Sequence, residues 1–493
     1  MALAIPIAGC GSSDSSSGGD NDPAKAVPAS APLYLEATVR PSGKQRTDLE
    51  AALSKILNTG DPGGKIKELI NQSASKDGQS YEKDIEPWLG DKAAITITGV
   101  AAGKPQTAAI LTSTDDSKAE DSLSKEKSYS DKRSYEGTDY RYDPSDRSAA
   151  AVTKGFAIVG DETAVKQIIG VLDKGGDSLA SNVDLQDARD KVGGDPGFMF
   201  VDLQSLLRDT MGSAGSALGP QQLSAFNGLF KSLRAIGVGV SANADAVRMN
   251  VVTLGEGPGT GQGPGSSLPL DKAPGDSWLA LTQSDIGKSI QGVLDSLKDS
   301  STGDQITQLE TATGLNLKED LLSWMGDAAV FVEGDSVPAL GGALVVESTD
   351  PAKTRATITK LKGFLTQFNQ RPGPAPDGAS AGFSLPAGNG KPVLIGVAGS
   401  RFVIAYGAKA FHDATNPSST LGSNSTFQGA KGLLGSSAKP SFYLDWQTVV
   451  RFITLAGGND PGFQKAKPYL DAFTAIIGGG SGDRTAEVAI GLK

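Results

Sequence analysis

Trp88-Leu89-Gly90-Asp91 is followed 236 positions later by a close copy of itself, Trp324-Met325-Gly326-Asp327. A helical-looking segment precedes each tetrapeptide, and an apolar run typical of a strand follows it, at residues 93–97 and 328–332. Internal repeats are the first pattern to seek in a chain, because overlooking one leads to the wrong fold. The two copies predict that the chain contains the same unit twice.

The similarity between the two halves extends well beyond the tetrapeptide. Residues 33–53 align with residues 277–297 without a gap, and Phe200–Gln204 resembles Tyr443–Gln447. The offset drifts by a few positions, as expected for insertions in surface loops. A period near 240 residues indicates a duplicated domain, since solenoid repeats are about 20–50 residues long. The predicted segments are two homologous units, residues 28–255 and 271–493, and a linker rich in glycine and proline at residues 256–270.

Each unit is predicted to have an α+β fold: a mainly antiparallel sheet with helices packed on one face. Strict alternation in Ile95-Thr96-Ile97-Thr98 is typical of a half-buried strand. The connections between consecutive strands are short, which favours antiparallel pairing because parallel strands need long crossovers. Amphipathic helices then cover one face of such a sheet.

The composition excludes several classes of protein. The net charge of −10 and the pI near 4.9 argue against a nucleic-acid partner, which requires a basic surface. No apolar run approaches the roughly 20 residues that span a membrane. A single cysteine excludes an intramolecular disulfide.

That cysteine ends the sequence Ile7-Ala8-Gly9-Cys10, which resembles the lipobox of bacterial lipoproteins. We expect residues 1–10 to be the remnant of a signal peptide and Cys10 to carry the lipid. The stretch has no basic n-region and a short apolar region, so we expect a start codon placed too late. Residues 11–27, rich in serine, glycine and aspartate, predict a disordered tether. The expected location is extracytoplasmic, anchored to the bacterial membrane; the alternative is a cytosolic protein with a chance apolar N-terminus.

The strand Pro32-Leu33-Tyr34-Leu35-Glu36-Ala37, the tryptophan turn before an apolar strand and the duplicated layout resemble the DUF3352 family of bacterial extracytoplasmic proteins. The resemblance covers nearly the whole ordered chain. It implies no known activity and supplies no catalytic residues.

We interpret the repeated tetrapeptide as structural. Trp88 and Trp324 are expected to fill a buried corner where a helix turns into the sheet. Gly90 and Gly326 are expected to end that helix in left-handed geometry, and Asp91 and Asp327 to hydrogen-bond at the strand entry. The alternative, a catalytic pair formed by the two aspartates, needs both carboxylates in one site.

Other candidate chemistry is weak. Ile286-Gly287-Lys288-Ser289 resembles the end of a phosphate-binding loop but lacks its earlier glycine, because position 282 is threonine. His412, the only histidine, is expected to be exposed, and Asp202 and Asp445 to cap helices. Asn21-Asp22 lacks the spacing of a calcium loop. We therefore expect no catalytic residues, cofactor or metal.

Three functions remain open at this point. The leading hypothesis is a non-enzymatic, lipid-anchored extracytoplasmic protein that binds a protein partner or supports the cell envelope. The second is a carrier of a lipid or other apolar ligand in a cavity between sheet and helices, which rests on fold analogy. The third is a hydrolase using serine with lysine or paired carboxylates, for which perturbed pKa values in one pocket would be the sign.

Overall fold

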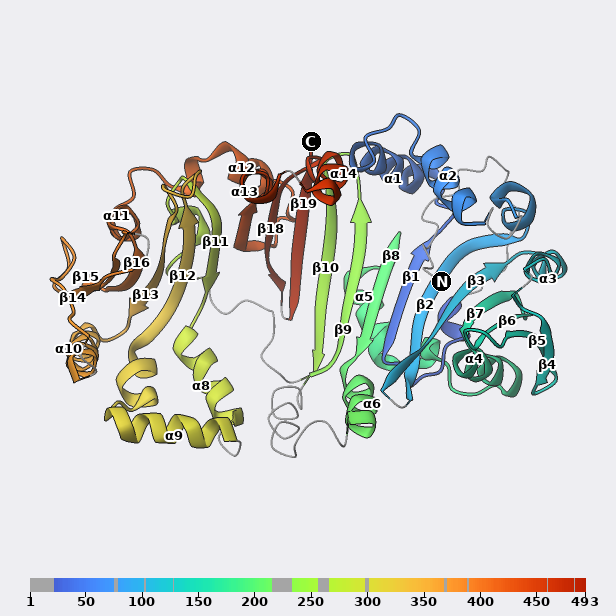
Figure 1. Cartoon of the computed structure of the whole chain (residues 1–493), viewed down its shortest axis with the longest axis horizontal. Coiled ribbons are helices and arrows are strands. Elements are labelled where there is room, and N and C mark those ends of the chain that lie inside the picture. Colours follow the sequence, from blue (N-terminus) through green and yellow to red (C-terminus); the bar gives the residue numbers. More distant parts are fainter. Residues whose placement is uncertain are drawn as a thin grey trace. The chain divides into compact units, whose positions relative to one another are not determined.

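The computed structural model describes residues 22–74, 79–101, 103–126, 128–214, 233–255, 266–297, 301–367, 370–387, 390–458, 460–482 and 484–493. The chain forms two compact units whose boundary falls at Pro258 and Gly259, called unit 1 and unit 2 below. Both mix helices with antiparallel strands (Figure 1). In the described part of the chain, no helix is both long and apolar enough to cross a membrane.

Unit 1 contains a sheet in which every pairing is antiparallel, with strand order β4-β5-β6-β7-β3-β2-β1-β8-β9-β10. Two-residue turns with both residues at positive φ join β4 to β5 (Glu136-Gly137) and β6 to β7 (Lys154-Gly155). This geometry matches the twist of a hairpin. The strands are β1 Leu33–Thr38, β2 Leu89–Ala101, β3 Lys104–Ser113, β4 Asp131–Tyr135, β5 Thr138–Asp143, β6 Ser148–Thr153, β7 Phe156–Asp161, β8 Gly197–Asp202, β9 Leu233–Ala242 and β10 Ala246–Gly255.

Unit 2 contains an antiparallel sheet with strand order β14-β15-β16-β13-β12-β11-β17-β18-β19. When β11 is matched to β1, the strands on either side of it follow the same order as in unit 1, except that unit 1 has the additional edge strand β4. The strands are β11 Ser277–Gln283, β12 Met325–Glu333, β13 Gly341–Ser348, β14 Ala381–Leu385, β15 Val393–Ala398, β16 Arg401–Tyr406, β17 Lys439–Asp445, β18 Phe473–Gly482 and β19 Thr485–Leu492.

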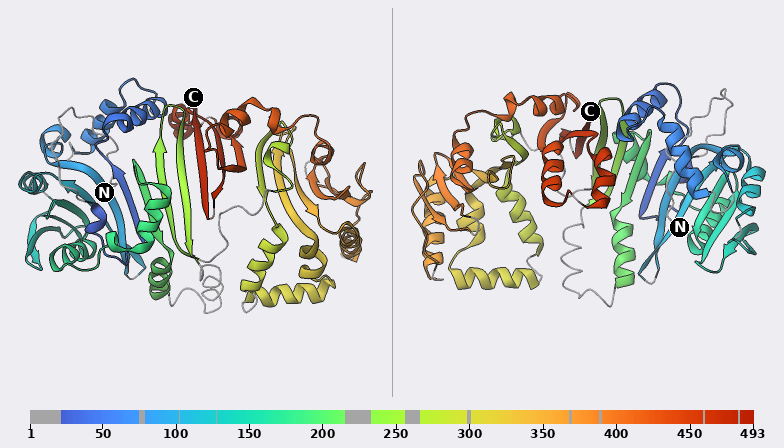
Figure 2. Two further views of the ribbon diagram at one scale, coloured as in Figure 1. Left: turned by 180° about the vertical axis from the view of Figure 1, so that it is seen from behind. Right: turned by 45° about the horizontal axis from the view of Figure 1, so that its top comes forward.

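Helices connect the strands in both units (Figure 2). In unit 1 they are α1 Gly43–Ile56, α2 Pro62–Ala74, α3 Asp116–Ser124, α4 Glu162–Lys174, α5 Val183–Val192 and α6 Leu203–Ala214, with the short helices η1 Pro23–Lys25, η3 Tyr81–Ile85 and η4 Leu179–Ser181. In unit 2 they are α8 Ile286–Leu297, α9 Ser301–Thr313, α10 Pro351–Gln367, α11 Ala408–Thr415, α12 Ser425–Lys431, α13 Trp446–Gly457 and α14 Pro461–Leu470, with η5 Leu270–Lys272, η6 Leu317–Leu321, η7 Leu322–Trp324 and η8 Leu421–Ser423.

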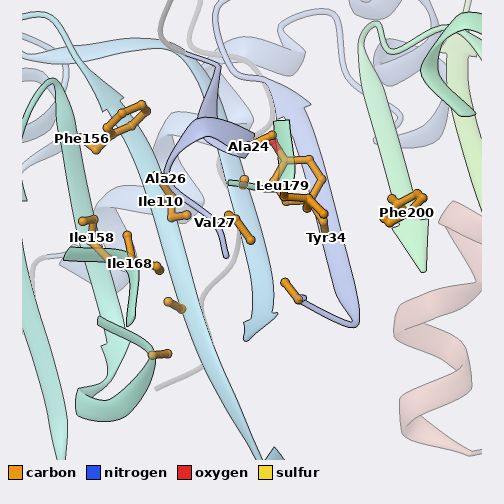
Figure 3. Close-up of a cluster of buried hydrophobic side chains, with 14 of the residues drawn as sticks. Ala24, Ala26, Val27, Tyr34, Ile110, Phe156, Ile158, Ile168, Leu179 and Phe200 are labelled. Atoms are coloured by element: carbon orange, nitrogen blue, oxygen red, sulfur yellow. The ribbon is translucent and has the colours of Figure 1, made fainter. Parts of the chain in front are cut away.

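The prediction that helices cover only one face of each sheet is wrong. Ala94 of β2 belongs to a core that includes residues of α4 and α5, among them Ile168 of α4, which Figure 3 shows, whereas its neighbour Ala93 belongs to a second core with Trp88. Unit 2 divides in the same way between Val345 and Val346 of β13. Successive side chains of a strand point to opposite faces, so adjacent buried residues show that both faces are covered.

The predicted tether and linker are both too long. Asp22 to Val27, assigned to the disordered tether, include η1, and Ala24, Ala26 and Val27 are fully buried in the core of unit 1. Leu268 and Leu270, assigned to the linker, are buried in the core of unit 2. Short stretches with only a few small apolar residues gave no periodic signal, although packing against the sheet orders them.

Candidate functional site

Both tryptophans of the repeated tetrapeptide are buried, Trp88 with 3% and Trp324 with 0% of its surface exposed. Trp88 follows η3, and Trp324 is the last residue of η7. Each indole N–H donates to the carbonyl oxygen four residues earlier, that of Asp84 at 2.6 Å and that of Asp320 at 2.8 Å. The same side chain therefore closes a helical turn and fills the corner beneath it, as the structural interpretation requires.

The backbone of each tryptophan is also held. The carbonyl oxygen of Trp88 accepts from the backbone N–H of Thr114 at 2.8 Å, and that of Trp324 accepts from Thr349 at 2.9 Å. Both threonine hydroxyls donate to the same oxygens, at 3.2 and 3.0 Å. The corner is thus tied to the end of the following strand pair in both units.

A carboxylate completes each corner. Asp84 accepts from the backbone N–H of Ser80 at 2.8 Å and pairs with the Lys125 ammonium at 2.6 Å. In unit 2, Asp320 accepts from the backbone N–H of Asn316 at 2.9 Å and pairs with the Lys360 ammonium at 2.7 Å. The hydrogen bond from each lysine lowers the pKa of each of these carboxyl groups.

The prediction that the two glycines end a helix in left-handed backbone geometry is wrong. Gly90 and Gly326 lie inside β2 and β12, and neither has a positive φ. Space explains Gly90, because a Cβ there would lie 2.3 Å from the hydroxyl oxygen of Thr112. At Gly326 the nearest atom to such a Cβ is the Glu347 carbonyl oxygen, 3.0 Å away.

The two aspartates lie in different units and have different contacts. The carboxylate of Asp327 accepts from the backbone N–H groups of Asp285, at 3.0 Å, and Ser267. Asp91 is exposed, and its backbone carbonyl oxygen accepts from Val39 at 2.7 Å. Side-chain hydrogen bonding at the strand entry is therefore found for Asp327, whereas Asp91 contributes its main chain.

The remaining candidates are capping or exposed residues. The Asp445 side chain accepts from the backbone N–H groups of Gln447 and Thr448 and caps α13, and Asp202 makes the same contacts at the start of α6. His412 is exposed on α11, with Nδ1 3.0 Å from Asp413 Oδ1. Cys10 lies outside the described residues.

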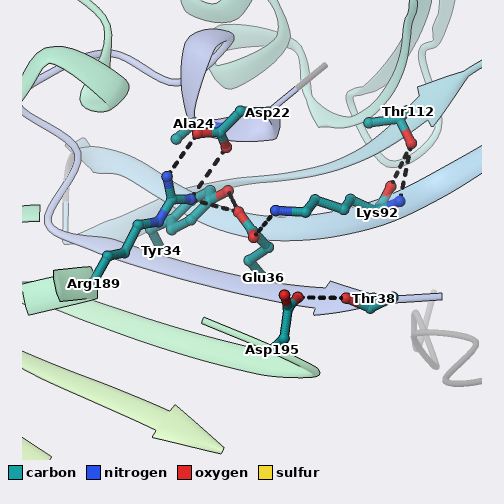
Figure 4. Close-up of polar contacts among 9 residues, drawn as sticks. All are labelled: Asp22, Ala24, Tyr34, Glu36, Thr38, Lys92, Thr112, Arg189 and Asp195. Carbon is teal, nitrogen blue, oxygen red and sulfur yellow. Dashed lines mark hydrogen bonds and ion pairs between the residues drawn. The ribbon is translucent and has the colours of Figure 1, made fainter. Parts of the chain in front are cut away.

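The sequence did not predict a buried charged network in unit 1 (Figure 4). Glu36 of β1 is 5% exposed, and its carboxylate accepts from Lys92 at 2.8 Å, from Arg189 at 2.6 Å and from the Tyr34 hydroxyl. Arg189 also pairs with Asp22 at 2.6 Å. Two carboxylates thus meet two cations, so the charges of the network balance.

Unit 2 contains a second charged cluster, in which the charges do not balance. The Lys409 ammonium of α11 lies 2.7 Å from Asp276, 2.9 Å from Glu333 and 2.6 Å from Asp413. Glu333, at the end of β12, is 1% exposed. Burial raises the pKa of Glu333 to about 7, and the negative charges of Asp276 and Asp413 act in the same direction. The hydrogen bond from Lys409 lowers this pKa but does not cancel the increase.

The three carboxylates have the mutual spacing of a metal site, since their oxygens lie within 4.8 Å of one another. The Lys409 ammonium, however, contacts all three. A divalent ion placed among them would face this positive charge at short range. The cluster is therefore an ammonium site filled by the protein itself and fits a metal poorly.

A cavity of about 360 Å³ lies beside this cluster. Its lining includes Ser277 and Trp278 of β11, whose hydroxyl oxygen and indole nitrogen are buried without a hydrogen-bond partner among the described residues. By contrast, the apolar cavity between Leu268, Phe331 and neighbouring residues measures about 40 Å³. Lys409 lies 133 positions from Asp276 in sequence, and no local motif signals that the two meet.

Comparison with known proteins gives little on function. No curated protein matches the sequence. Crystal form I of TP0453 matches at 9% identity with a TM-score of 0.26, covering 50% of this chain and 82% of that one. Crystal form III matches at 10% identity with a TM-score of 0.28, covering 48% and 82%. These similarities are too low to support an inference about fold or function.

The sequence itself gives a clear assignment. A family model described as "Protein of unknown function (DUF3352)" matches residues 7–476. Because this match spans nearly the whole chain, the protein belongs to the DUF3352 family.

Proposed function

We propose that the protein is a non-enzymatic, lipid-anchored extracytoplasmic protein that presents two copies of one α+β domain to a protein partner in the cell envelope. The observation that carries the proposal is the sequence Ile7-Ala8-Gly9-Cys10, with the only cysteine at its end, followed by a polar stretch. Eleven residues separate Cys10 from Asp22, the first described residue, and a chain of that length reaches at most about 40 Å when extended. That length is enough to hold unit 1 clear of a membrane surface.

Homology between the two units is part of this proposal. Support comes from the common strand order and from matched contacts at the tryptophan corners. A further match involves Asn182 and Asn424, which cap α5 and α12. Their side-chain amides donate to Ala29 O at 3.4 Å and Gly275 O at 2.9 Å. Unrelated sheets would not repeat such long-range contacts at the same points of the chain.

The absence of catalysis is also a proposal, and the charged groups support it. The buried carboxylates Glu36 and Glu333 are both held by ammonium or guanidinium groups of the same unit. General acid–base work needs a group free to reach substrate at hydrogen-bonding distance. These side chains instead hold strands and helices together.

The small size of the cavity near Phe331 argues against the alternative that the protein carries an apolar ligand. About 40 Å³ holds roughly one water molecule, whereas ligand pockets measure about 300–1,000 Å³. In the part of unit 2 that lines this cavity, sheet and helices are closely packed.

The anchor is tested with Cys10→Ser, expressed from a gene that includes the complete signal sequence. The variant is expected to leave the membrane fraction, because a serine cannot carry the thioether-linked lipid. Ser12→Ala in the same stretch is the matched control and should stay with membranes. A Cys10→Ser protein that sediments with membranes as the wild type does would contradict the proposal.

A further inference from the structure

We propose that the exposed face of α10 in unit 2 docks on an anionic phospholipid membrane surface. The inference rests on the lipid anchor proposed above, because an anchored chain is held close to a membrane. A lipid and a basic surface are two signals that act together in peripheral membrane proteins. The lipid then fixes the address, and α10 gives unit 2 a membrane contact of its own.

The first argument is the composition of α10. The helix has no aspartate or glutamate among its 17 residues, and it has four basic residues, Lys353, Arg355, Lys360 and Lys362. All four are exposed, in a chain whose net charge is −10. A cluster of four or more lysines and arginines on one helix is typical of surfaces that bind anionic lipid headgroups.

Most of this positive charge is not used within the fold. Lys360 pairs with Asp320 at 2.7 Å, whereas Lys353, Arg355 and Lys362 form no ion pair with any described residue. The acidic residue before the helix is also occupied, because its carboxylate accepts from backbone N–H groups of the first helical turn at 3.1 and 3.0 Å. Three cations are therefore available to a partner.

The packing of α10 fixes which of its faces is turned outward. Ile358 is buried in the core around Trp324, and Leu361 and Leu365 pack against the same core. The Thr357 hydroxyl accepts from the Trp324 indole N–H at 3.2 Å. Figure 1 shows the helix beside β14 of the same unit. The basic side chains thus lie on the solvent side of a firmly held helix.

The exposed face is a strip of small residues bordered by cations. Residues seven positions apart lie on nearly the same side of a helix, so Lys353 and Lys360 form one row and Arg355 and Lys362 another. The exposed residues between the rows are Ala352, Ala356, Thr359 and Gly363. Long basic side chains reach past such small neighbours, so both rows can contact one flat surface. A membrane offers such a surface.

The corresponding helix of unit 1 shows that this charge is not needed for the fold. Both α3 and α10 follow the sequence Ser-Thr-Asp, which relates their residues by an offset of 235. Lys125 and Lys360, related by that offset, each pair with the carboxylate of their own tryptophan corner. Arg355, however, corresponds to Glu120, and α3 has three acidic residues and one lysine. The lysine at the corner is common to both units, and the basic face belongs to unit 2.

The acidity of the whole chain does not prevent this contact. The Debye length is about 8 Å at physiological ionic strength, so charges farther than that from the membrane are largely screened. The cations of α10 lie on the outer side of the helix and act on the surface at short range. Local charge therefore decides the interaction.

The test is flotation of the full chain carrying Cys10→Ser with lipid vesicles. This chain has no lipid of its own, so its binding reports on the folded surface. Vesicles of phosphatidylcholine are compared with vesicles in which about a third of the lipid is phosphatidylglycerol. We expect binding to the anionic vesicles only, and its loss at about 0.5 M NaCl, where the Debye length falls below about 5 Å.

Two double variants locate the contact. Each basic residue near an anionic membrane contributes about fivefold to the affinity, so Arg355→Gln with Lys362→Gln should lower the partition coefficient about 25-fold. Lys431→Gln with Lys465→Gln is the matched control, because it removes the same charge from exposed residues of α12 and α14 in the same unit. It should change binding less than about twofold. Thermal melts of both variants should match the wild type.

Several results would overturn the proposal. These are equal binding to neutral and anionic vesicles, equal losses in the two double variants, or no vesicle binding at low salt. Tighter binding to polyglutamate than to anionic vesicles, at the same concentration of negative charge, would assign α10 to an acidic protein partner and contradict the membrane contact.

Failure of the anchor would look different. In cells, washing the membranes with high salt removes protein held by α10 alone and leaves lipid-anchored protein in place. Release of the wild type by this wash would contradict the anchor and not the vesicle result. Wild type that withstands the wash, combined with an unlipidated chain that ignores anionic vesicles, would contradict only the contact through α10.

Discussion

Unit 1 and unit 2 agree closely at the tryptophan corner and differ in their charged groups. At the corner, equivalent atoms form equivalent hydrogen bonds, down to the indole N–H donating four residues back. The charged groups have different compositions: two carboxylates with two cations around Glu36, but three carboxylates with one ammonium around Glu333. The difference indicates that the corner serves folding in both units, while each unit has its own arrangement of buried charges.

The largest expected effect tests the shared corner. Trp88→Ala and Trp324→Ala should each cost about 3–5 kcal/mol of unfolding free energy, because each removes a buried indole and leaves a cavity. Urea unfolding followed by circular dichroism measures both. Asp327→Asn is the control with a smaller expected cost, since asparagine keeps one of the two accepting oxygens and no buried ring is removed. A large cost in one unit and none in the other would break the comparison.

The balanced network gives the next effect. Arg189→Met keeps most of the side-chain volume but leaves Glu36 and Asp22 without their shared cation, which should cost about 3 kcal/mol. Trp88 is the only tryptophan in unit 1, so its fluorescence reports on that unit once the other three are replaced by phenylalanine. Arg234→Met, at a more exposed ion pair, should cost less than about 1 kcal/mol. Equal costs would show that the network adds nothing beyond a surface pair.

The unbalanced cluster predicts a pH dependence. The pKa of Glu333 is about 7 in the folded protein and 4.5 ordinarily, so the folded state binds the extra proton. The stabilisation from that proton is complete below pH 4.5 and lost as pH rises through 7. Glu333→Gln should therefore be more stable relative to wild type at pH 8 than at pH 5, by about 2 kcal/mol. Unfolding curves at the two pH values measure this, and an unchanged difference would contradict the assigned pKa.

The smallest effect separates the two glycines. Gly90→Ala should cost at least about 1 kcal/mol of unfolding free energy, because the new methyl group overlaps the Thr112 hydroxyl. That hydroxyl is held in place by hydrogen bonds to the backbone N–H and carbonyl oxygen of Lys92. Gly326→Ala should cost less, since its nearest contact is 3.0 Å away. Thermal melts of the pair decide the order. The reverse order would mean that backbone conformation, rather than space, selects glycine here.

The strands that follow the tetrapeptide could be predicted because they are apolar runs, and in residues 95–98 apolar and polar residues alternate. Ala93 and Ala94 mark where prediction failed, because two small adjacent residues gave no sign that both faces of β2 are covered. Similarly, Ala24 and Val27 resemble tether residues in composition but lie in the core. Composition alone does not distinguish a short buried segment from a solvated one.

The charged clusters lay beyond sequence reasoning for a different reason. Arg189 meets Asp22 across 167 positions, and Lys409 meets Asp276 across 133. Such pairs form only once the sheet brings distant segments together. The network around Glu36 and the cluster around Glu333 therefore follow from topology and not from any motif.

The ion pair between Asp22 and Arg189 has a mechanical consequence. Asp22 precedes η1, and its carboxylate receives both terminal guanidinium nitrogens of Arg189, at 2.6 and 3.1 Å. Any tension along the N-terminal segment reaches this clamp and the buried residues Ala24, Ala26 and Val27 before it reaches β1. Because Arg189 also pairs with Glu36 of β1, a pull on the start of the chain would be shared between α5 and the first strand.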